Sequence, residues 1–351
     1  MKQFQRVYIE ITDYCGLSCA FCPSSSRLYN QYKTRAIAAQ TSLIFKSQKL
    51  SLATSFSLQS ISTPQNSMKL INVSSNIKAR FPYRGVMPID MFESICAQIY
   101  NKTRRVCLHL LGDPLSVRNL DEYVAILGRY KLRVDLVTTG LFLSKSHFDM
   151  LIGLPFVQVS FSLSAFFANQ SKLNKTHLIR ILEFCRYKVS KNSPIFINLR
   201  LHSNDISQNS KALNDMLREI SVFFRIKPNQ IESMLPNGKV RLANKVLLVP
   251  KQSFEWKLNN YSIDRNELVK REHSKYGVRF CHGAHEQIGI LSNGNVVPCC
   301  IDYDGNASFG CIKDISLNEI LNSSKFIEFK NKLELGMPAS KLCQSCGYVK
   351  R

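Results

Sequence analysis

Short β-rich runs alternate with amphipathic stretches from residue 7 to about residue 235, and this alternation limits the possible folds more than any other feature of the chain. It predicts strands at Val7–Thr12, Val106–Leu111, Val134–Thr138, Val157–Leu163 and Ile195–Leu201, with a weaker sixth near Ile231–Leu235 or at Val246–Val249. It predicts helices at Ile89–Tyr100, Leu120–Tyr130, Ser146–Ile152, Lys175–Lys188 and Lys211–Phe223. The fold class is therefore α/β with a parallel sheet of about six β/α units, either doubly wound or an incomplete barrel.

The first β/α connection is interrupted by an insert at about residues 24–85. Residues 14–89 contain no Asp or Glu, and Ser and Thr are concentrated between Ser24 and Ser75. A connection this long is either an accessory segment or a lid that contacts the substrate. The insert therefore divides the expected barrel domain, which covers residues 1–235.

Two further parts follow the barrel. Residues 236–276 are a Lys- and Asn-rich bridging segment with Trp256, and residues 277–351 form a small α+β module. In that module the run QIGILSNGNVVPCC predicts a hairpin with a type I′ turn at Asn293 and Gly294. The run SLNEILNSSKFIEFKNKL predicts one helix, whose apolar face carries Leu317, Ile320, Leu321, Phe326 and Phe329.

Composition narrows the class of protein. The 351 residues have no apolar run of about 18 residues and no signal peptide, so we expect a soluble, cytoplasmic protein without a membrane partner. Twelve cysteines in a reducing compartment indicate metal ligands before disulfides. The net charge of +22 favours an anionic partner, although a general lysine bias of the source proteome explains it equally.

Three cysteines follow the first predicted strand in the run CGLSCAFCP: Cys15, Cys19 and Cys22. Three thiolates within eight residues hold three corners of a 4Fe-4S cluster and leave one iron open for a substrate. A structural zinc ion needs four ligands, and no His or Cys completes the set before Cys96. The spacing therefore favours an open cluster at the mouth of the fold.

The run ITDYCGLSCAFCPSS resembles the signature of the radical S-adenosylmethionine superfamily, with Phe21 as its aromatic position. The resemblance implies a partial (β/α)6 barrel whose open iron binds S-adenosylmethionine. It also implies that one electron from the cluster releases methionine and a 5′-deoxyadenosyl radical, which abstracts a hydrogen atom from the substrate.

Later strands resemble further elements of that superfamily. In LHLLGDPL, Gly112 and Asp113 are candidates for the methionyl amino group, and in TTG, Thr138 is a candidate for the adenine or substrate wall. Ser162 is the candidate for the cofactor carboxylate or ribose, and Arg200 is the candidate for the methionyl carboxylate. A general base stays unassigned between His109 and Arg200.

A second cysteine group occupies the last seventy residues. The candidate ligands are Cys281, Cys299, Cys343 and Cys346, with Cys300 as a substitute for Cys299 and Cys311 as a buried structural thiol. Four thiolates suit either a closed 4Fe-4S cluster or zinc. Their layout resembles the twitch form of the SPASM auxiliary-cluster domain, which implies two 4Fe-4S clusters in the whole chain.

The resemblance implies an oxidoreductase in which the auxiliary cluster accepts an electron from the substrate radical. The layout is similar to that of aminocyclitol dehydrogenases and of peptide maturases, so the substrate is a small molecule or a peptide. Flavodoxin or ferredoxin is the expected reductant, and nucleic acid is not an expected partner. A zinc-stabilised basic binding module is the alternative from another class, and it predicts bound zinc and no absorbance near 400 nm.

Overall fold

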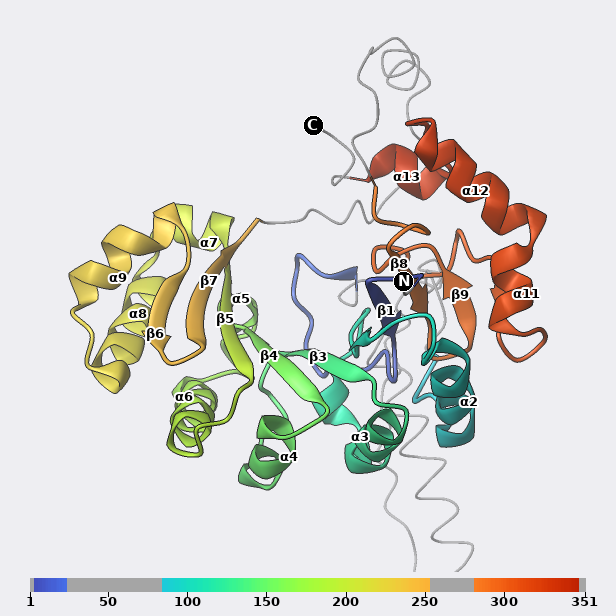
Figure 1. Ribbon diagram of the computed structural model, residues 1–351. Coiled ribbons are helices and arrows are strands. Elements are labelled where there is room, and N and C mark those ends of the chain that lie inside the picture. Colours follow the sequence, from blue (N-terminus) through green and yellow to red (C-terminus); the bar gives the residue numbers. More distant parts are fainter. Residues whose placement is uncertain (1–2, 24–83, 253–280, 347–351) are drawn as a thin grey trace, which may run out of the picture. The chain divides into compact units, whose positions relative to one another are not determined.

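The computed structural model describes residues 3–23, 84–252 and 281–346. These residues form one ten-stranded sheet in the order β10-β9-β8-β1-β2-β3-β4-β5-β7-β6 (Figure 1). The parallel strands are β1 (Arg6–Ile9), β2 (Arg105–Cys107), β3 (Arg133–Thr138), β4 (Phe156–Ser162), β5 (Phe196–His202), β7 (Val246–Lys251) and β8 (Gln287–Ile290).

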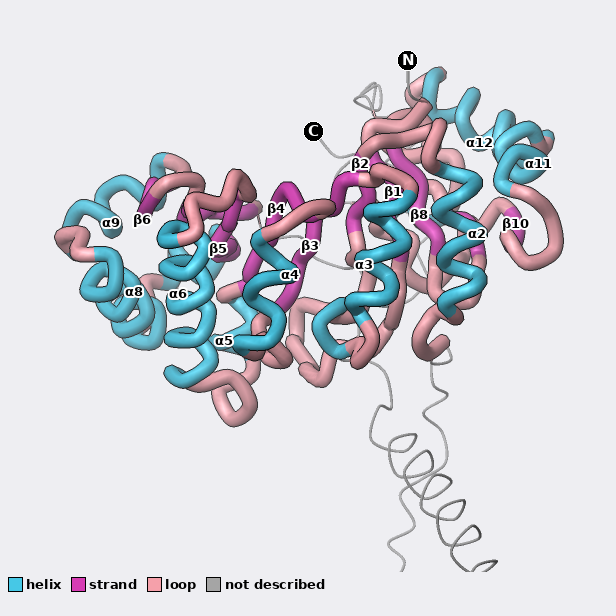
Figure 2. The backbone as a smooth tube through the Cα atoms, turned by 60° about the horizontal axis from the view of Figure 1, so that its bottom comes forward, coloured by secondary structure: helices cyan, strands magenta, loops and turns pink. Residues whose placement is uncertain are grey.

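The strand order decides between the two architectures that the sequence left open. Strands β1 to β5 lie side by side in chain order, whereas a doubly wound sheet reverses its order at a switch point. Right-handed crossovers in a constant direction place the helices on one face of the sheet. Figure 2 shows α2, α3, α4 and α6 along that face. The fold is therefore an incomplete (β/α) barrel, as expected.

Five helices match the sequence pattern closely. They are α2 (Ile89–Ile99), α3 (Leu120–Arg129), α4 (Phe148–Ile152), α6 (Lys175–Ser190) and α8 (Lys211–Phe224). Their apolar faces pack against alternate strand residues, so Val7 and Ile9, for example, are 0% exposed. The other residues of each strand, such as Arg6 and Tyr8, lie on the opposite face, which we call the inner face. The short helices that the sequence did not predict include α5 (Ser164–Ala168), α7 (Ser203–Gln208) and α9 (Pro228–Met234).

The sixth barrel strand is β7 at Val246–Lys251, and the alternative at Ile231–Leu235 is wrong. That segment is mostly helix α9, because Pro228 stands in its first turn and Ile231 packs into the core. Strand β6 (Val240–Ala243) pairs antiparallel with β7, so the barrel sheet continues to Lys251. The predicted barrel boundary at residue 235 stays a prediction. The rest of the bridging segment from residue 253, including Trp256, lies outside the described residues, as does nearly all of the predicted insert.

The C-terminal part extends the same sheet. Strand β8 pairs in parallel with β1 over the whole of Arg6–Ile9, and β9 (Asn295–Val297) and β10 (Gly310–Cys311) follow antiparallel. The module is thus continuous with the barrel through β1. Its long predicted helix is two helices, α11 (Leu317–Asn322) and α12 (Ser324–Glu334), because Ser323 has extended backbone and caps α12.

The predicted hairpin is present, but its turn type is wrong. The Gly294 amide donates to the Leu291 carbonyl oxygen at 2.8 Å, and only Gly294 of the predicted pair has a positive φ, at 96°. This is a three-residue loop that ends in a left-handed glycine. In the described residues no helix is long and apolar enough to cross a membrane.

Candidate functional site

The first three cysteines lie on the loop that follows β1. The Leu17 amide donates to Cys15 Sγ at 3.4 Å, and the Cys22 amide donates to the Cys19 carbonyl oxygen at 2.9 Å. Cys19 is buried, whereas Cys15 and Cys22 are half-buried. The thiols of Cys19 and Cys22 both raise the pKa of Cys15, so the three side chains lie near one another.

Asn169 fixes this loop from the end of α5. Its Nδ2 donates to Cys19 Sγ at 3.0 Å, and its Oδ1 accepts from the Ser18 amide at 3.1 Å. Lys172 Nζ adds a bond to the Gly16 carbonyl oxygen at 2.8 Å. Sequence reasoning missed Asn169, because nothing in its local pattern connects it with cysteines about 150 positions away.

Burial raises the pKa of Cys15 to about 12 and that of Cys19 to about 11. These thiols therefore hold their protons at neutral pH unless a cation replaces them. Sulfur ligands suit iron. The N–H groups that donate to Cys15 Sγ and Cys19 Sγ would also donate to these sulfurs as metal-bound thiolates. The residues of this loop thus fit an iron-sulfur cluster.

The run Gly112–Asp113–Pro114 joins the ends of neighbouring strands. An added Cβ at Gly112 would stand 2.1 Å from the Thr12 carbonyl oxygen, so only glycine fits beside the loop that leads to the cysteines. The Asp113 side chain is buried, and its Oδ2 accepts from Thr138 Oγ1 at 2.9 Å and Thr139 Oγ1 at 2.8 Å. The described contacts of Asp113 are thus structural. Its predicted contact with the methionyl amino group, like that of Gly112, stays a prediction.

The remaining cofactor candidates lie on neighbouring strand ends. Thr138 is buried and turned to Asp113. Ser162 and Arg200 are Cα partners in the β4–β5 register, so both face the inner side of the sheet together. Phe21 is 36% exposed, and its ring meets the His202 ring edge-on at 4.7 Å. The structure therefore brings Phe21 to the end of β5, two residues beyond Arg200.

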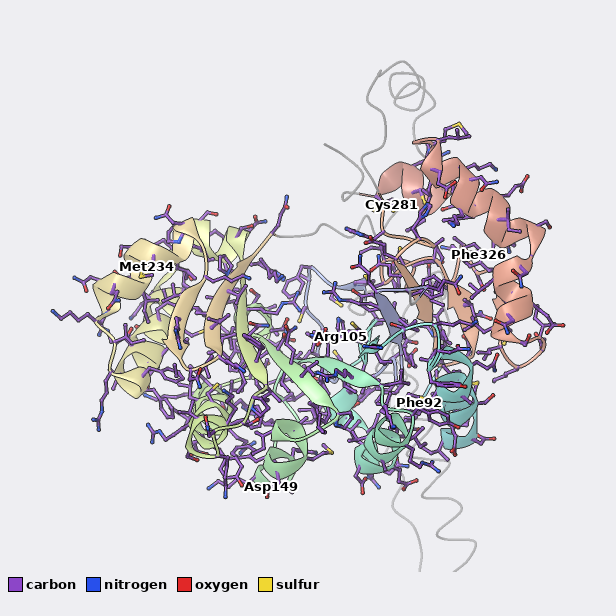
Figure 3. All side chains as sticks on the ribbon, viewed as in Figure 1. Phe92, Arg105, Asp149, Met234, Cys281 and Phe326 are labelled. Atoms are coloured by element: carbon purple, nitrogen blue, oxygen red, sulfur yellow. The ribbon has the colours of Figure 1, made fainter. Side chains whose placement is uncertain are left out.

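The auxiliary cysteines also converge. Cys281 lies next to helix α13 (Lys341–Ser345), which carries Cys343 (Figure 3). Its Sγ accepts from the Gly283 amide at 3.4 Å, and Cys343 Sγ accepts from Ser340 Oγ at 3.4 Å. Burial raises the pKa of Cys281 and that of Cys299. The Cys343 and Cys346 thiols raise the pKa of Cys281 further, and the Cys281 thiol raises that of Cys299. This set also fits a cluster.

Cys300 faces the barrel. The Tyr8 hydroxyl on β1 donates to its sulfur, and Cys346 perturbs its pKa. Both members of the Cys299–Cys300 pair thus adjoin the auxiliary group, and the choice of Cys299 stays a prediction. Cys311 is half-buried rather than buried and bonds the Asn293 carbonyl oxygen at 3.7 Å.

A buried ion pair, which the sequence did not reveal, joins three parts of the chain. Arg84 Nε donates to Glu10 Oε1 at 2.9 Å and Nη2 donates to Oε2 at 2.9 Å. The Arg84 guanidinium also reaches the Tyr303 carbonyl oxygen at 2.9 Å, and Ser292 Oγ donates to Glu10 at 3.1 Å. This group, which we call the Arg84 clasp, links the end of the insert with β1 and the C-terminal module.

In the parts of the chain that the structure describes, no group of three or more His, Cys, Asp or Glu side chains is arranged so that it could hold a single metal ion. A 4Fe-4S cluster has a different requirement, because each thiolate binds a different iron. Residues 281–347 match the family model SPASM, an iron-sulfur cluster-binding domain. The match favours iron-sulfur over zinc at the second cysteine group.

The whole chain is similar in fold to solved structures. SuiB from Streptococcus suis bound to S-adenosylmethionine has a TM-score of 0.52 at 15% identity, over 99% of this chain and 72% of that chain. SuiB bound to the precursor peptide SuiA has a TM-score of 0.51 at 15% identity, with the same coverage. BtrN in complex with AdoMet and 2-DOIA has a TM-score of 0.46 at 16% identity, over 99% of this chain and 94% of that chain. No curated protein sequence matches the chain.

The chain has an incomplete α/β barrel that is similar in fold to SuiB, followed by a region that matches an iron-sulfur cluster-binding domain. Both findings agree with the expected resemblance. The fold comparison does not reach individual residues, so the roles of the cofactor candidates and of each cysteine stay predictions.

Proposed function

We propose that this protein is a radical S-adenosylmethionine oxidoreductase that holds two 4Fe-4S clusters. One observation carries the proposal: a loop of three cysteines, held by Asn169, leaves the carboxyl end of β1 in a barrel whose sheet continues into a SPASM domain. When bound, the cofactors would supply a 5′-deoxyadenosyl radical that takes a hydrogen atom from the substrate, and the auxiliary cluster would accept one electron from the substrate radical as that radical loses a proton.

The chain's own residues have separate tasks in this proposal. Cys15, Cys19 and Cys22 bind the first cluster, and the Asn169 amide stabilises the Cys19 thiolate through its N–H···S bond. Phe21, Gly112, Asp113, Thr138, Ser162 and Arg200 surround S-adenosylmethionine.

Cys281, Cys299, Cys343 and Cys346 bind the auxiliary cluster. Four protein ligands leave no open iron, so this cluster handles electrons rather than substrate. A flavodoxin or ferredoxin supplies the electron for the first cluster, and the reducing cytoplasm keeps the thiols free.

Peptide maturation is a second candidate. The acid-free segment 14–89 is suited to an acidic leader peptide, and SuiB was solved with its precursor peptide. If the protein is a maturase, deletion of residues 27–80 should abolish turnover of the peptide but spare the uncoupled cleavage of S-adenosylmethionine. If turnover of a small-molecule substrate survives the deletion, the result favours an oxidoreductase that acts on a small molecule.

The proposed function is tested by anaerobic reconstitution with iron and sulfide, reduction, and quantification of 5′-deoxyadenosine. We expect a brown protein with about eight irons per chain that forms 5′-deoxyadenosine. Cys22→Ala should abolish that product, whereas Cys185→Ala, in the core of α6, should retain it. No 5′-deoxyadenosine from the wild-type protein would refute the proposal.

The auxiliary ligand set has its own iron assay. Cys299→Ala should lower the iron content by about half, whereas Cys300→Ala should keep it near the wild-type value. The opposite result would make Cys300 the ligand, and zinc in place of iron in both variants would exclude an auxiliary cluster.

A further inference from the structure

Several charged side chains share the inner face of the barrel sheet. The residues of β1, β5 and β7 that pack against the helices are apolar, so the intervening residues lie on the inner face. This places Arg6 and Tyr8 from β1, Arg200 and His202 from β5, and Lys251 from the end of β7 on one face. The Tyr8 and His109 rings meet edge-on with centroids 5.4 Å apart, so His109 belongs to the same face.

The cations of this face lie within electrostatic reach of one another. Lys251 is the Cα partner of His202 in the β5–β7 register, and Arg200 is two residues before His202. Partial burial of its ammonium group lowers the pKa of Lys251, and Arg200, Lys239 and Arg6 lower it further. In the described residues, every charge that perturbs Lys251 is positive. A face lined with charges of one sign raises the local concentration of ions of the opposite sign.

His109 stands in this positive field with a polar atom in need of a partner. Its Nδ1 is buried and has no hydrogen bond within the described residues. Burial, Arg200 and Arg6 lower the pKa of His109 to about 3, so the ring is neutral at pH 7. A neutral imidazole offers one donor and one acceptor, and an unsatisfied buried group costs about 1–3 kcal/mol. When Nδ1 carries the ring proton, a ligand that accepts a hydrogen bond removes this cost.

The same face adjoins both cysteine groups. The ring centroids of His202 and Phe21, in the first cysteine loop, are 4.7 Å apart. The Tyr8 hydroxyl donates to the sulfur of Cys300, beside the auxiliary cysteines. A substrate that reacts at the first site and gives an electron to the second lies between these two contacts.

We infer that Arg6, Lys251 and His109 form an anion-binding site for a carboxylate or phosphate group of the substrate. The inference rests on the proposed function and adds to it the chemical class of the substrate. Arg6 and Lys251 are both exposed, so a ligand can reach them, and charge-assisted hydrogen bonds to such groups are the strong ones. Arg200 is left to the cofactor carboxylate, so the site does not depend on it.

The test measures anion binding to the reconstituted full-length protein by anaerobic calorimetry. The probes are inorganic phosphate and a short polyglutamate peptide, at constant ionic strength in chloride. We expect saturable binding of at least one probe, weakened about tenfold or more in the double variant Arg6→Gln/Lys251→Gln, because two charge-assisted hydrogen bonds are removed. The tighter probe separates a phosphorylated small molecule from an acidic peptide.

Two variants control for charge and folding. Arg241→Gln/Lys313→Gln removes two exposed cations elsewhere and should bind like the wild type. Arg6→Lys/Lys251→Arg keeps both charges and should keep most of the affinity. Equal binding in wild type and Arg6→Gln/Lys251→Gln, or no saturable binding of either probe, would overturn the inference.

The proposed function and this inference fail in distinguishable ways. Cleavage of S-adenosylmethionine by the wild-type protein without substrate tests the function alone. If cleavage occurs while neither anion binds, only the anion site is wrong. If an anion binds while no cleavage occurs, the function is wrong and the site remains as an anion site of another kind.

Discussion

The Arg84 clasp allows a quantitative prediction. The Glu10 side chain is 0% exposed and that of Arg84 is 5% exposed, so both charges are removed from water. Replacing Arg84 by Met removes two bonds to Glu10 and one to the Tyr303 carbonyl oxygen, and leaves a buried carboxylate with only the Ser292 donors. Loss of one partner from a buried pair costs about 3–5 kcal/mol. We expect Arg84→Met to lower the free energy of unfolding by that amount.

The loss should depend on pH. Burial raises the pKa of Glu10, and Arg84 opposes this rise. Without Arg84 the pKa rises further. A carboxyl with a raised pKa contributes stability below its unfolded value of about 4.3 and loses it as the pH rises through the folded value. The destabilisation by Arg84→Met should therefore be smallest at acidic pH, where Glu10 is protonated in both folded proteins, and should grow as the pH rises above the folded pKa of Glu10 in the wild type.

The assay is urea unfolding followed by circular dichroism at 222 nm, with the midpoints compared among variants. Glu10→Gln/Arg84→Met should regain most of the stability, because a neutral Gln replaces the unpaired charge. The matched control is Arg129→Met, whose 2.9 Å ion pair with Glu93 is exposed and should cost less than about 1 kcal/mol. If Arg84→Met costs no more than Arg129→Met, or if its cost does not change with pH, the clasp is not a buried ion pair of this kind.

Two further predictions concern the first cysteine loop and its neighbour. Asn169→Ala removes the N–H donor to Cys19 and should speed iron loss to a chelator by about tenfold, while Asn322→Ala at an exposed position should not; equal rates would contradict the role of Asn169. Gly112→Ala would place a Cβ 2.1 Å from a backbone carbonyl oxygen and should sharply reduce soluble yield and melting temperature, whereas Gly128→Ala, with open space around it in α3, should raise stability by up to about 1 kcal/mol; a neutral Gly112→Ala would show that the backbone there can move.

The elements that sequence reasoning predicted correctly are those with local signals. The helices α2 and α6 and the strands β3 and β4 carry complete periodic patterns, and their predicted bounds agree with the structure to within two residues. The split between α11 and α12 was missed because the apolar period continues across Ser323. At that position a local capping bond decides the break, and the periodicity does not report it.

The site was predictable only where the residues are close in sequence. The spacing of Cys15, Cys19 and Cys22 indicated the first loop, and the family model agrees with a cluster domain at the second group. Asn169 and the Arg84 clasp depend on contacts across 150 and 74 positions, and no single-sequence pattern encodes such pairs. Asp113 shows a further limit, because its motif did not reveal that its carboxylate links strand ends, while its predicted contact with the methionyl amino group stays a prediction.

The parallel pairing of β8 with β1 has a consequence for how this protein can be dissected. Truncating the chain before residue 281 would remove β8 from the sheet. The backbone amide and carbonyl groups on that edge of β1, next to the cysteine loop, would then have no strand to pair with. Such an edge recruits other chains, so a truncated barrel should aggregate for reasons unrelated to its chemistry. The contribution of the second cysteine group is therefore better separated by single side-chain replacements than by removing the domain.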